Sequence, residues 1–239
     1  MFIDAQKQGY QNELRFFLLL KLMYRDGKVG LDNADLKFIE FVEQIKLRKT
    51  SVRYIKFLLE LGFLRYNSKT GFYLLQSFDT IREMQNWKSR LAFRIDFSNY
   101  YKIQAVTGAV VYGYLHKVYW RNVKRKRSVP IKGSTYHSLS LTYNYKQQFA
   151  PVSVIGIKKI FGISQAAASR LKNAAVAEKY IKVKKNFSEP ISNKILVERA
   201  LQYNDMPNKI VYHNHEYRLQ LIDTICPLFF FTKRTKLKT

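Results

Sequence analysis

Apolar residues at helical spacing predict three helices in the first sixty positions. The first helix covers residues 10–25, and Gly27 follows it as a stop signal. The second begins after Asp32 or Asn33, and the third begins after Thr50 or Ser51, because these polar side chains can cap a helix. The positions expected to face inward are Leu14, Phe17, Leu18 and Leu22 or Met23 in the first helix, Leu36, Ile39 and Val42 in the second, and Val52, Ile55, Leu58 and Leu59 in the third.

Two short extended runs follow the third predicted helix. They cover residues 63–66 and 72–75, and the polar loop 67–71 joins them as a hairpin. Three helices followed by a hairpin is the order of a winged helix. Residues 1–78 are therefore expected to form an N-terminal winged-helix-like unit.

Residues 79–132 are expected to form a helical connector that ends in a basic arm. The pattern predicts a helix around residues 81–87, an alternating strand over 90–97, a long helix over 99–121 and a basic linker over 121–132. Glycine inside a helix costs about 1 kcal/mol relative to alanine. We therefore expect close helix packing where the long helix carries small residues, which are Ala105, Gly108, Ala109 and Gly113.

A second unit is expected over residues 133–225. A helix should begin at Pro151 and end at Phe161, Gly162 should make a turn, and Ser164 should cap a further helix that runs to Ala177. Residues 180–184 then alternate between apolar residues and lysine, as the strand of a wing would. A hairpin is predicted around the turn His213-Asn214-His215, and residues 226–239 form a basic tail.

These elements together predict a mainly α protein with small β-hairpin wings. The fold class is α+β, with two winged-helix units joined by a helical middle. The units share one order of elements, which is a helix, a polar turn, a short capped helix and a basic strand.

The charge of the chain predicts a polyanionic partner. The 239 residues carry a formal net charge of +25, and residues 81–239 hold +21 of it. Residues 99–188 alone contain 17 Lys or Arg and a single acidic residue, Glu178. Aromatic content of 15% argues against a disordered basic tail.

Other classes of protein fit the sequence less well. Cys226 is the single cysteine, so a disulfide within the chain and a cysteine-based zinc site are excluded. The longest apolar runs are too short to span a bilayer and no signal peptide is evident, so we expect a cytoplasmic, nucleoid-associated protein without a membrane partner.

Residues 162–171 resemble the helix-turn-helix signature of the winged-helix superfamily. Gly162 permits a left-handed turn, and Ile163, Ala168 and Leu171 can pack on the preceding helix. The resemblance implies that the helix 164–177 enters a major groove, where Gln and Arg side chains pair with base edges and small residues, Ala166 or Ala167, touch a thymine methyl group. The expected DNA-binding residues of this unit are Gln165, Ala166, Ser169, Arg170, Lys172 and Asn173 on the helix, Lys182, Lys184 and Lys185 on the wing, and Lys124, Arg125, Lys126 and Arg127 on the arm.

The first unit resembles the same superfamily through residues 49–56 and its hairpin. It could bind DNA, or it could serve dimerisation or another protein contact. If it binds DNA, the expected residues are Lys49, Thr50, Ser51, Arg53 and Lys56.

An enzyme is not expected, and neither is a cofactor or a metal site. The sequence contains no Gly-rich phosphate loop and no cluster of paired carboxylates. His213-Asn214-His215 faintly resembles the metal motif of rolling-circle nicking enzymes, but an exposed hairpin turn explains it more simply.

The sequence therefore predicts a protein that binds double-stranded DNA, such as a transcription regulator of a mobile element or phage. A plasmid or phage replication initiator is one alternative, and a protein-binding winged-helix module that acts on a host or replication partner is another. A homodimer and contacts with the replication or transcription machinery stay open.

Overall fold

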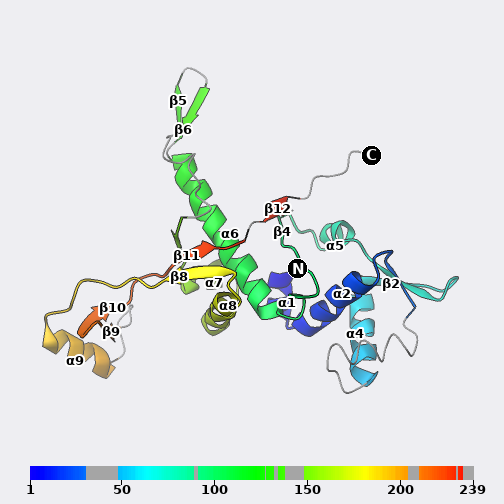
Figure 1. Ribbon diagram of the computed structural model, residues 1–239, viewed down its shortest axis with the longest axis horizontal. Helices are drawn as coiled ribbons and strands as arrows, with labels where there is room; N and C mark the ends of the chain where they lie inside the picture. The colour runs from blue at the N-terminus through cyan, green and yellow to red at the C-terminus, as the bar shows by residue number, and fades with distance from the viewer. Residues whose placement is uncertain are drawn as a thin grey trace. The chain divides into compact units, whose positions relative to one another are not determined.

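The computed structural model describes residues 1–30, 48–88, 91–126, 128–131, 134–137, 148–203, 210–229 and 231–233. The fold is mixed α/β, with helices and small antiparallel sheets (Figure 1). The chain divides into two compact units. Unit 1 contains Met1–Val106 and Phe230–Thr239, and unit 2 contains Thr107–Phe229.

Unit 1 combines four described helices with short strands. Its elements are α1 (Phe2–Gln8), α2 (Gln11–Met23), β1 (Lys28–Val29), α4 (Arg48–Glu60), β2 (Leu64–Asn67), β3 (Phe72–Leu75), α5 (Phe78–Met84), β4 (Leu91–Ala92) and β12 (Thr232–Lys233). The strands β1, β3 and β2 form an antiparallel sheet in that order, so the last strand of the hairpin is central. The strand β12 pairs with β4.

The helix α2 forms the centre of the unit 1 core. Its residues Phe16–Leu20 are all buried, so nearly every side of this helix is covered. A helix that is apolar all round is stable only when other elements surround it. Phe63 packs against Phe17 with 5.2 Å between the ring centroids, which joins the hairpin to α2.

The predicted first helix and the hairpin of unit 1 are confirmed, but the start of the third helix was wrong. The helix α4 begins at Arg48, so Thr50 and Ser51 lie inside it and do not cap it. Val52 was expected to face inward, whereas 53% of it is exposed. Leu58 is fully buried as expected. The predicted second helix lies outside the described residues.

The predicted strand over residues 90–97 was mostly wrong. Only Leu91–Ala92 forms a strand, β4. The following segment makes turns, in which the Asp96 carboxylate accepts hydrogen bonds from the Ser98 amide and hydroxyl. Aspartate and serine favour such local bonds over a sheet ladder.

Unit 2 is built around a long helix that begins just before the boundary between the units. Its elements are α6 (Ile103–Lys126), β5 (Ser128–Ile131), β6 (Ser134–His137), β7 (Ala150–Pro151), α7 (Val154–Phe161), α8 (Gln165–Ala177), β8 (Ile181–Lys184), α9 (Lys194–Tyr203), β9 (Ile210–His213), β10 (Glu216–Leu219) and β11 (Thr224–Pro227). The strands β7, β11 and β8 form an antiparallel sheet in that order.

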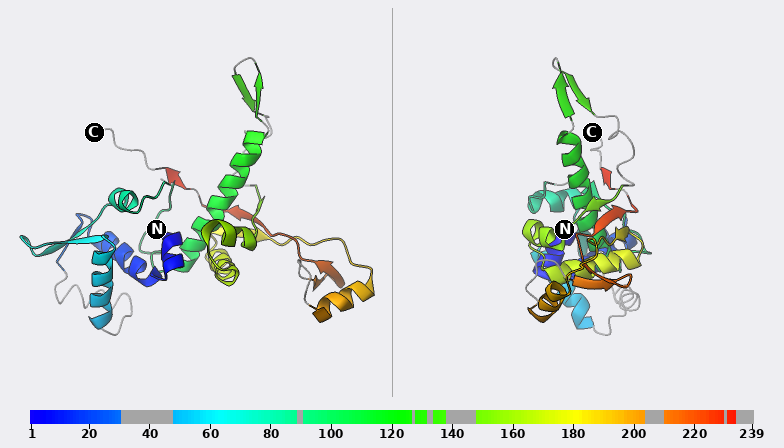
Figure 2. Two further views of the ribbon diagram at one scale, coloured as in Figure 1. Left: turned by 180° about the vertical axis from the view of Figure 1, so that it is seen from behind. Right: turned by 90° about the vertical axis from the view of Figure 1, so that its left-hand side faces the viewer.

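The expected close packing of the long helix is confirmed at Gly108, where α6 meets α8. Figure 2 shows the ribbons of these two helices from two further sides. A Cβ atom at this position would lie 2.1 Å from the carbonyl oxygen of Leu171 and 3.0 Å from the Cβ of Ala175. The backbones of α6 and α8 can approach this closely only because residue 108 has no side chain.

Two predicted boundaries in unit 2 were wrong. The long helix starts at Ile103 and continues to Lys126, so the first half of the predicted linker over 121–132 is helical, and Ser128–Ile131 forms β5. Pro151 belongs to the strand β7, and the following helix is capped by the Ser153 hydroxyl, which accepts a hydrogen bond from the Gly156 amide at 2.8 Å. Serine at this position satisfies an amide that the helix itself leaves unpaired.

The connection from β8 to β11 continues the pairing of these strands. The Leu221 amide donates to the Asn186 carbonyl, and the Ser188 amide donates to the Leu219 carbonyl, each at 2.9 Å. A bridge pairs Phe187 with Gln220 between them. The helix α9 and the hairpin β9–β10 follow at the far end of this ladder. The predicted hairpin around His213-Asn214-His215 is confirmed as β9–β10.

Candidate nucleic-acid interface

The turn between α7 and α8 has the backbone geometry that the sequence predicted. Gly162 ends α7 with φ of 67°, in the left-handed region that glycine adopts without strain. The Ser164 hydroxyl then accepts a hydrogen bond from the Ala167 amide at 3.2 Å and caps α8. These two residues fix where α8 begins.

One face of α8 is held firmly against the body of unit 2. Ala168, Leu171 and Ala175 are buried, and Ile163 in the turn is buried with them. The Tyr112 hydroxyl on α6 donates to the carbonyl of Ala168 at 3.0 Å. Burial raises the pKa of Tyr112, and the negative charge of Asp223 raises it further, so the phenol keeps its proton and continues to donate.

The opposite face of α8 is exposed and carries no acidic residue. Arg170 lies on this face, one turn after Ala166 and one turn before Asn173. The exposed residues of the turn and helix are Gly162, Ser164, Gln165, Ala166, Arg170, Asn173, Val176 and Ala177. Ser169 is half-buried at the border of the face. Ala167 is only 9% exposed, so of the two alanines expected to touch a thymine methyl group, Ala166 is the exposed one.

Lys172 serves the fold instead of the exposed face. Its ammonium pairs with the carboxylate of Asp223, which is only 8% exposed. The contact of Lys172 with DNA stays a prediction, and a phosphate would have to compete with a buried carboxylate for the same cation. The pair joins α8 to the residue that precedes β11.

The strand β8 presents its lysines outward as predicted. Ile181, the first residue of the strand, is buried, whereas Lys182 and Lys184 are exposed. Lys185 is exposed just beyond the strand. Cys226 on β11 lies opposite Lys182 and is buried. Burial raises the pKa of its thiol, although Lys182 opposes this, so Cys226 is a poor nucleophile.

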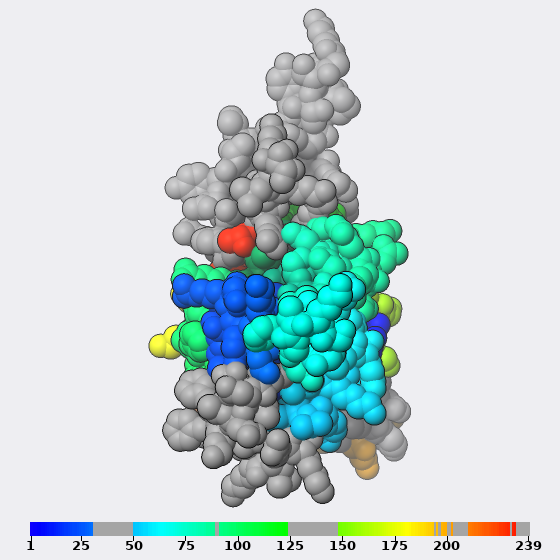
Figure 3. Space-filling model, turned by 90° about the vertical axis from the view of Figure 1, so that its right-hand side faces the viewer, coloured from blue at the N-terminus to red at the C-terminus, as the bar shows by residue number. Residues whose placement is uncertain are grey.

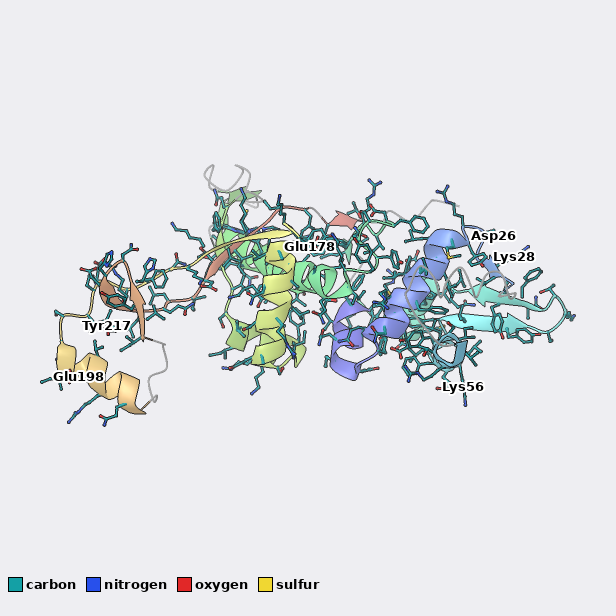
Figure 4. The ribbon with its side chains drawn as sticks, turned by 60° about the horizontal axis from the view of Figure 1, so that its bottom comes forward. Asp26, Lys28, Lys56, Glu178, Glu198 and Tyr217 are labelled. Atoms are coloured by element: carbon teal, nitrogen blue, oxygen red, sulfur yellow. The ribbon has the colours of Figure 1, made fainter. Side chains whose placement is uncertain are left out.

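Glu178 lies at the C-terminal end of α8, before the start of β8 (Figure 4). From Ser164 to Lys185 the chain carries six basic residues and this one acidic residue, a net charge of +5. The exposed end of α7 adds Lys158 and Lys159, which the site prediction missed. Their place within the acid-poor segment was the signal that could have found them.

The predicted basic arm is mostly a helix end. Lys124, Arg125 and Lys126 belong to the last turn of α6, so a free linker at these positions was wrong. Arg127 lies outside the described residues. Cations in the last turn of a helix also interact favourably with the helix dipole, which explains in part why the helix continues this far.

The candidate residues of unit 1 divide into exposed and buried groups. Arg53 and Lys56 are exposed on α4, and Thr50 is half-buried. Ser51 is fully buried, so its predicted contact with DNA is wrong. Lys49 lies in the first turn of α4.

The described residues contain no group of three or more His, Cys, Asp or Glu side chains that could hold a metal ion. None of their helices combines the length and the apolar character needed to cross a bilayer.

Comparison of the chain with protein-family models, with curated proteins and with solved structures finds no match.

Proposed function

We propose that the protein binds double-stranded DNA, reads it with the exposed face of α8 and performs no covalent chemistry. The observation that carries this proposal is the coincidence of an acid-free exposed helix face with a net charge of +5 between Ser164 and Lys185. An α-helix fits the major groove of B-DNA, and lysine and arginine around it neutralise phosphates.

The division of labour among the side chains follows from their chemistry. Arg170 can form two hydrogen bonds with a guanine edge, and Gln165 can do the same with adenine. Ala166 has a small side chain, so the backbone near the N-terminus of α8 could approach the floor of the groove. Lys182 and Lys184 project from β8 and would bind flanking phosphates, which position the protein without reading sequence.

The order of elements supports a winged-helix arrangement of unit 2. Apart from the hairpin β5–β6 and the inserted elements α9, β9 and β10, the helix α6 is followed by β7, α7, α8, β8 and β11, and β11 is central in the sheet. Unit 1 has a related order, since α2, β1, α4, β2 and β3 follow one another and β3 is central. We therefore propose two winged-helix units, of which unit 2 is the DNA reader.

The biological role that fits this activity best is transcription regulation of a mobile element or phage. A regulator binds its site and leaves the duplex paired. A replication initiator would also melt adjacent DNA, so permanganate reactivity of thymines beside the bound site would contradict the regulatory role and leave DNA binding intact.

The test of DNA binding is a mobility-shift titration on duplexes selected from a random pool, repeated over a range of salt. The logarithm of affinity should fall by about 0.9 per log unit of salt for each phosphate contact. Arg170→Ala should weaken binding by about 1–3 kcal/mol and relax one base position if it reads a base.

Arg199→Ala is the matched control, because Arg199 is exposed on α9, also in unit 2. It should change affinity much less. Equal binding by the parent and Arg170→Ala on every duplex would refute the role of Arg170. Absence of salt-sensitive duplex binding by the parent would refute the proposed function itself.

A further inference from the structure

Within residues 1–78 the net positive charge lies in α4 and the hairpin β2–β3. Residues 1–47 contain seven basic and seven acidic residues, so their net charge is zero. Residues 48–75 contain six basic residues and one acidic residue, Glu60, which gives +5. The basic residues are Arg48, Lys49, Arg53, Lys56, Arg65 and Lys69. The net charge of +5 on residues 1–78 is therefore concentrated in these 28 residues.

The four cations that follow Lys49 in this segment are all exposed. Arg53 and Lys56 lie one turn apart on α4, where Figure 4 labels Lys56 on the outer side of the helix. Arg65 lies on β2 and Lys69 in the turn of the hairpin. Figure 3 shows α4 and the hairpin (light blue to turquoise) on the drawn face, beside a blue part of the N-terminal segment.

An apolar residue accompanies these cations on α4. Val52 is 53% exposed beside Arg53, and the Arg53 guanidinium lies over the Tyr54 ring at 5.4 Å from its centroid. Val52 has no role in the core. A methyl-bearing side chain among cations on an exposed helix is suited to the thymine methyl group in a major groove.

The same local arrangement occurs in unit 2. In each unit a 13-residue helix leads directly into an outer strand of a three-stranded sheet whose last strand is central. Residues 48–75 of unit 1 and residues 164–185 of unit 2 each carry a net charge of +5. The helix α4 thus corresponds to α8, and Arg53 and Lys56 lie on its exposed side as Arg170 does on α8.

We infer that α4 and the hairpin β2–β3 form a second surface for duplex DNA, so that one chain binds two duplex segments. This inference rests on the proposed function of α8. An acidic protein could also be attracted to the cations, but the repeated pairing of an exposed helix with a basic strand favours duplex DNA as the partner.

The test compares full-length double variants of equal charge. Arg53→Ala with Lys56→Ala removes two cations from the proposed surface. Lys7→Ala with Arg25→Ala removes two exposed cations from the charge-neutral part of unit 1. On a 60-base-pair duplex, the first variant should lower the salt slope of binding by about 1.8, and the control variant should leave it unchanged.

Hydroxyl-radical footprinting on a selected duplex separates this inference from the proposed function. The parent should protect two segments, Arg170→Ala should weaken one, and the Arg53 and Lys56 variant should weaken the other. A parent that binds with a single footprint unaffected by the Arg53 and Lys56 changes would overturn the inference and leave α8 as the reader. A parent without duplex binding would overturn both. Circular dichroism of each variant checks that it is folded.

Discussion

The two three-stranded sheets share a strand order but differ in how their last two strands are joined. In unit 1, β2 and β3 are joined by a tight turn in which the Gly71 amide donates to the Asn67 carbonyl at 2.9 Å. In unit 2, residues 185–223 separate β8 from β11. The second connection holds a helix and a hairpin of its own, yet the sheet closes in the same order.

This difference shows that the sheet does not depend on a short connection. The entropic cost of closing a loop rises only with the logarithm of its length, so a long insertion costs little once the strands pair. In unit 2 the pairing continues outward through Asn186 and Ser188, which brings the two ends of the insertion together. The insertion 185–223 contains five basic and five acidic residues, in contrast to the basic elements around it.

The largest expected effect comes from breaking the ion pair that fastens the far end of this connection to α8. Lys172→Met keeps most of the side-chain volume but leaves the Asp223 carboxylate buried without its cation. Loss of one partner of such a pair should lower the free energy of unfolding by about 3 kcal/mol. Urea denaturation followed by circular dichroism measures it.

Two companion variants test whether the loss of stability comes from the unpaired Asp223 carboxylate. Lys184→Met removes an exposed lysine of β8 and should leave stability nearly unchanged. Combining Lys172→Met with Asp223→Asn should recover part of the loss, because no buried charge is then unpaired. If Lys172→Met were as stable as the parent, Lys172 would be available for DNA after all.

The next effect concerns the close approach of α6 to α8. Gly108→Ala places a methyl group against the Leu171 carbonyl, so the helices must separate. Overpacking of this kind costs about 1–3 kcal/mol. Hydrogen exchange should increase in peptides of α6 and α8 and stay unchanged in α2, since the contact belongs to unit 2.

Gly156→Ala is the matched control within the same unit. A Cβ atom there meets only the Ser153 hydroxyl at 3.4 Å, and alanine favours a helix. Its exchange should match that of the parent or be slower. Equal exchange in Gly108→Ala and the parent would show that α6 and α8 are not packed this closely.

A smaller effect is expected on how the stability of each unit depends on pH, because all four histidines lie in unit 2. His116 is buried, and its Nε2 donates to the Gln148 carbonyl at 2.6 Å. Burial lowers its pKa, and the bond to Gln148 opposes this only in part. The unfolded chain therefore binds a proton at higher pH than the folded chain does.

The pH dependence of the stability of unit 2 follows from this order of proton binding. The stability of unit 2 is complete above the unfolded-state value, about 6.5, and declines as pH falls below it by up to about 1.4 kcal/mol per pH unit. His116→Gln keeps an N–H donor and should flatten this decline. His215→Asn, in an exposed turn, should leave it as in the parent. A decline that persists in His116→Gln would assign the acid sensitivity to other groups.

The sequence predicted local elements better than long-range partners. The turn at Gly162, the cap at Ser164 and the alternation in β8 depend on neighbouring residues, and each is confirmed. The pairing of Lys172 with Asp223 joins residues 51 positions apart, and no local pattern marks it. The prediction that Val52 faces inward was wrong because the burial of residues on α4 depends on which side of the helix meets α2. Helical spacing alone does not decide this.

The smallest expected effect comes from making the two connections alike. Replacing residues 189–218 with Asn-Gly would join Ser188 to Leu219, which already pair, through the two-residue turn that antiparallel strands favour. The deleted segment contains four basic and four acidic residues, so the net charge is unchanged. Because α8 and β8 are retained, duplex affinity should change by less than about 0.5 kcal/mol, and the salt slope should stay the same. Mobility shift over a range of salt measures both. Loss of affinity in a folded deletion variant would place part of the proposed DNA contact in the insertion and show that the two connections are not equivalent.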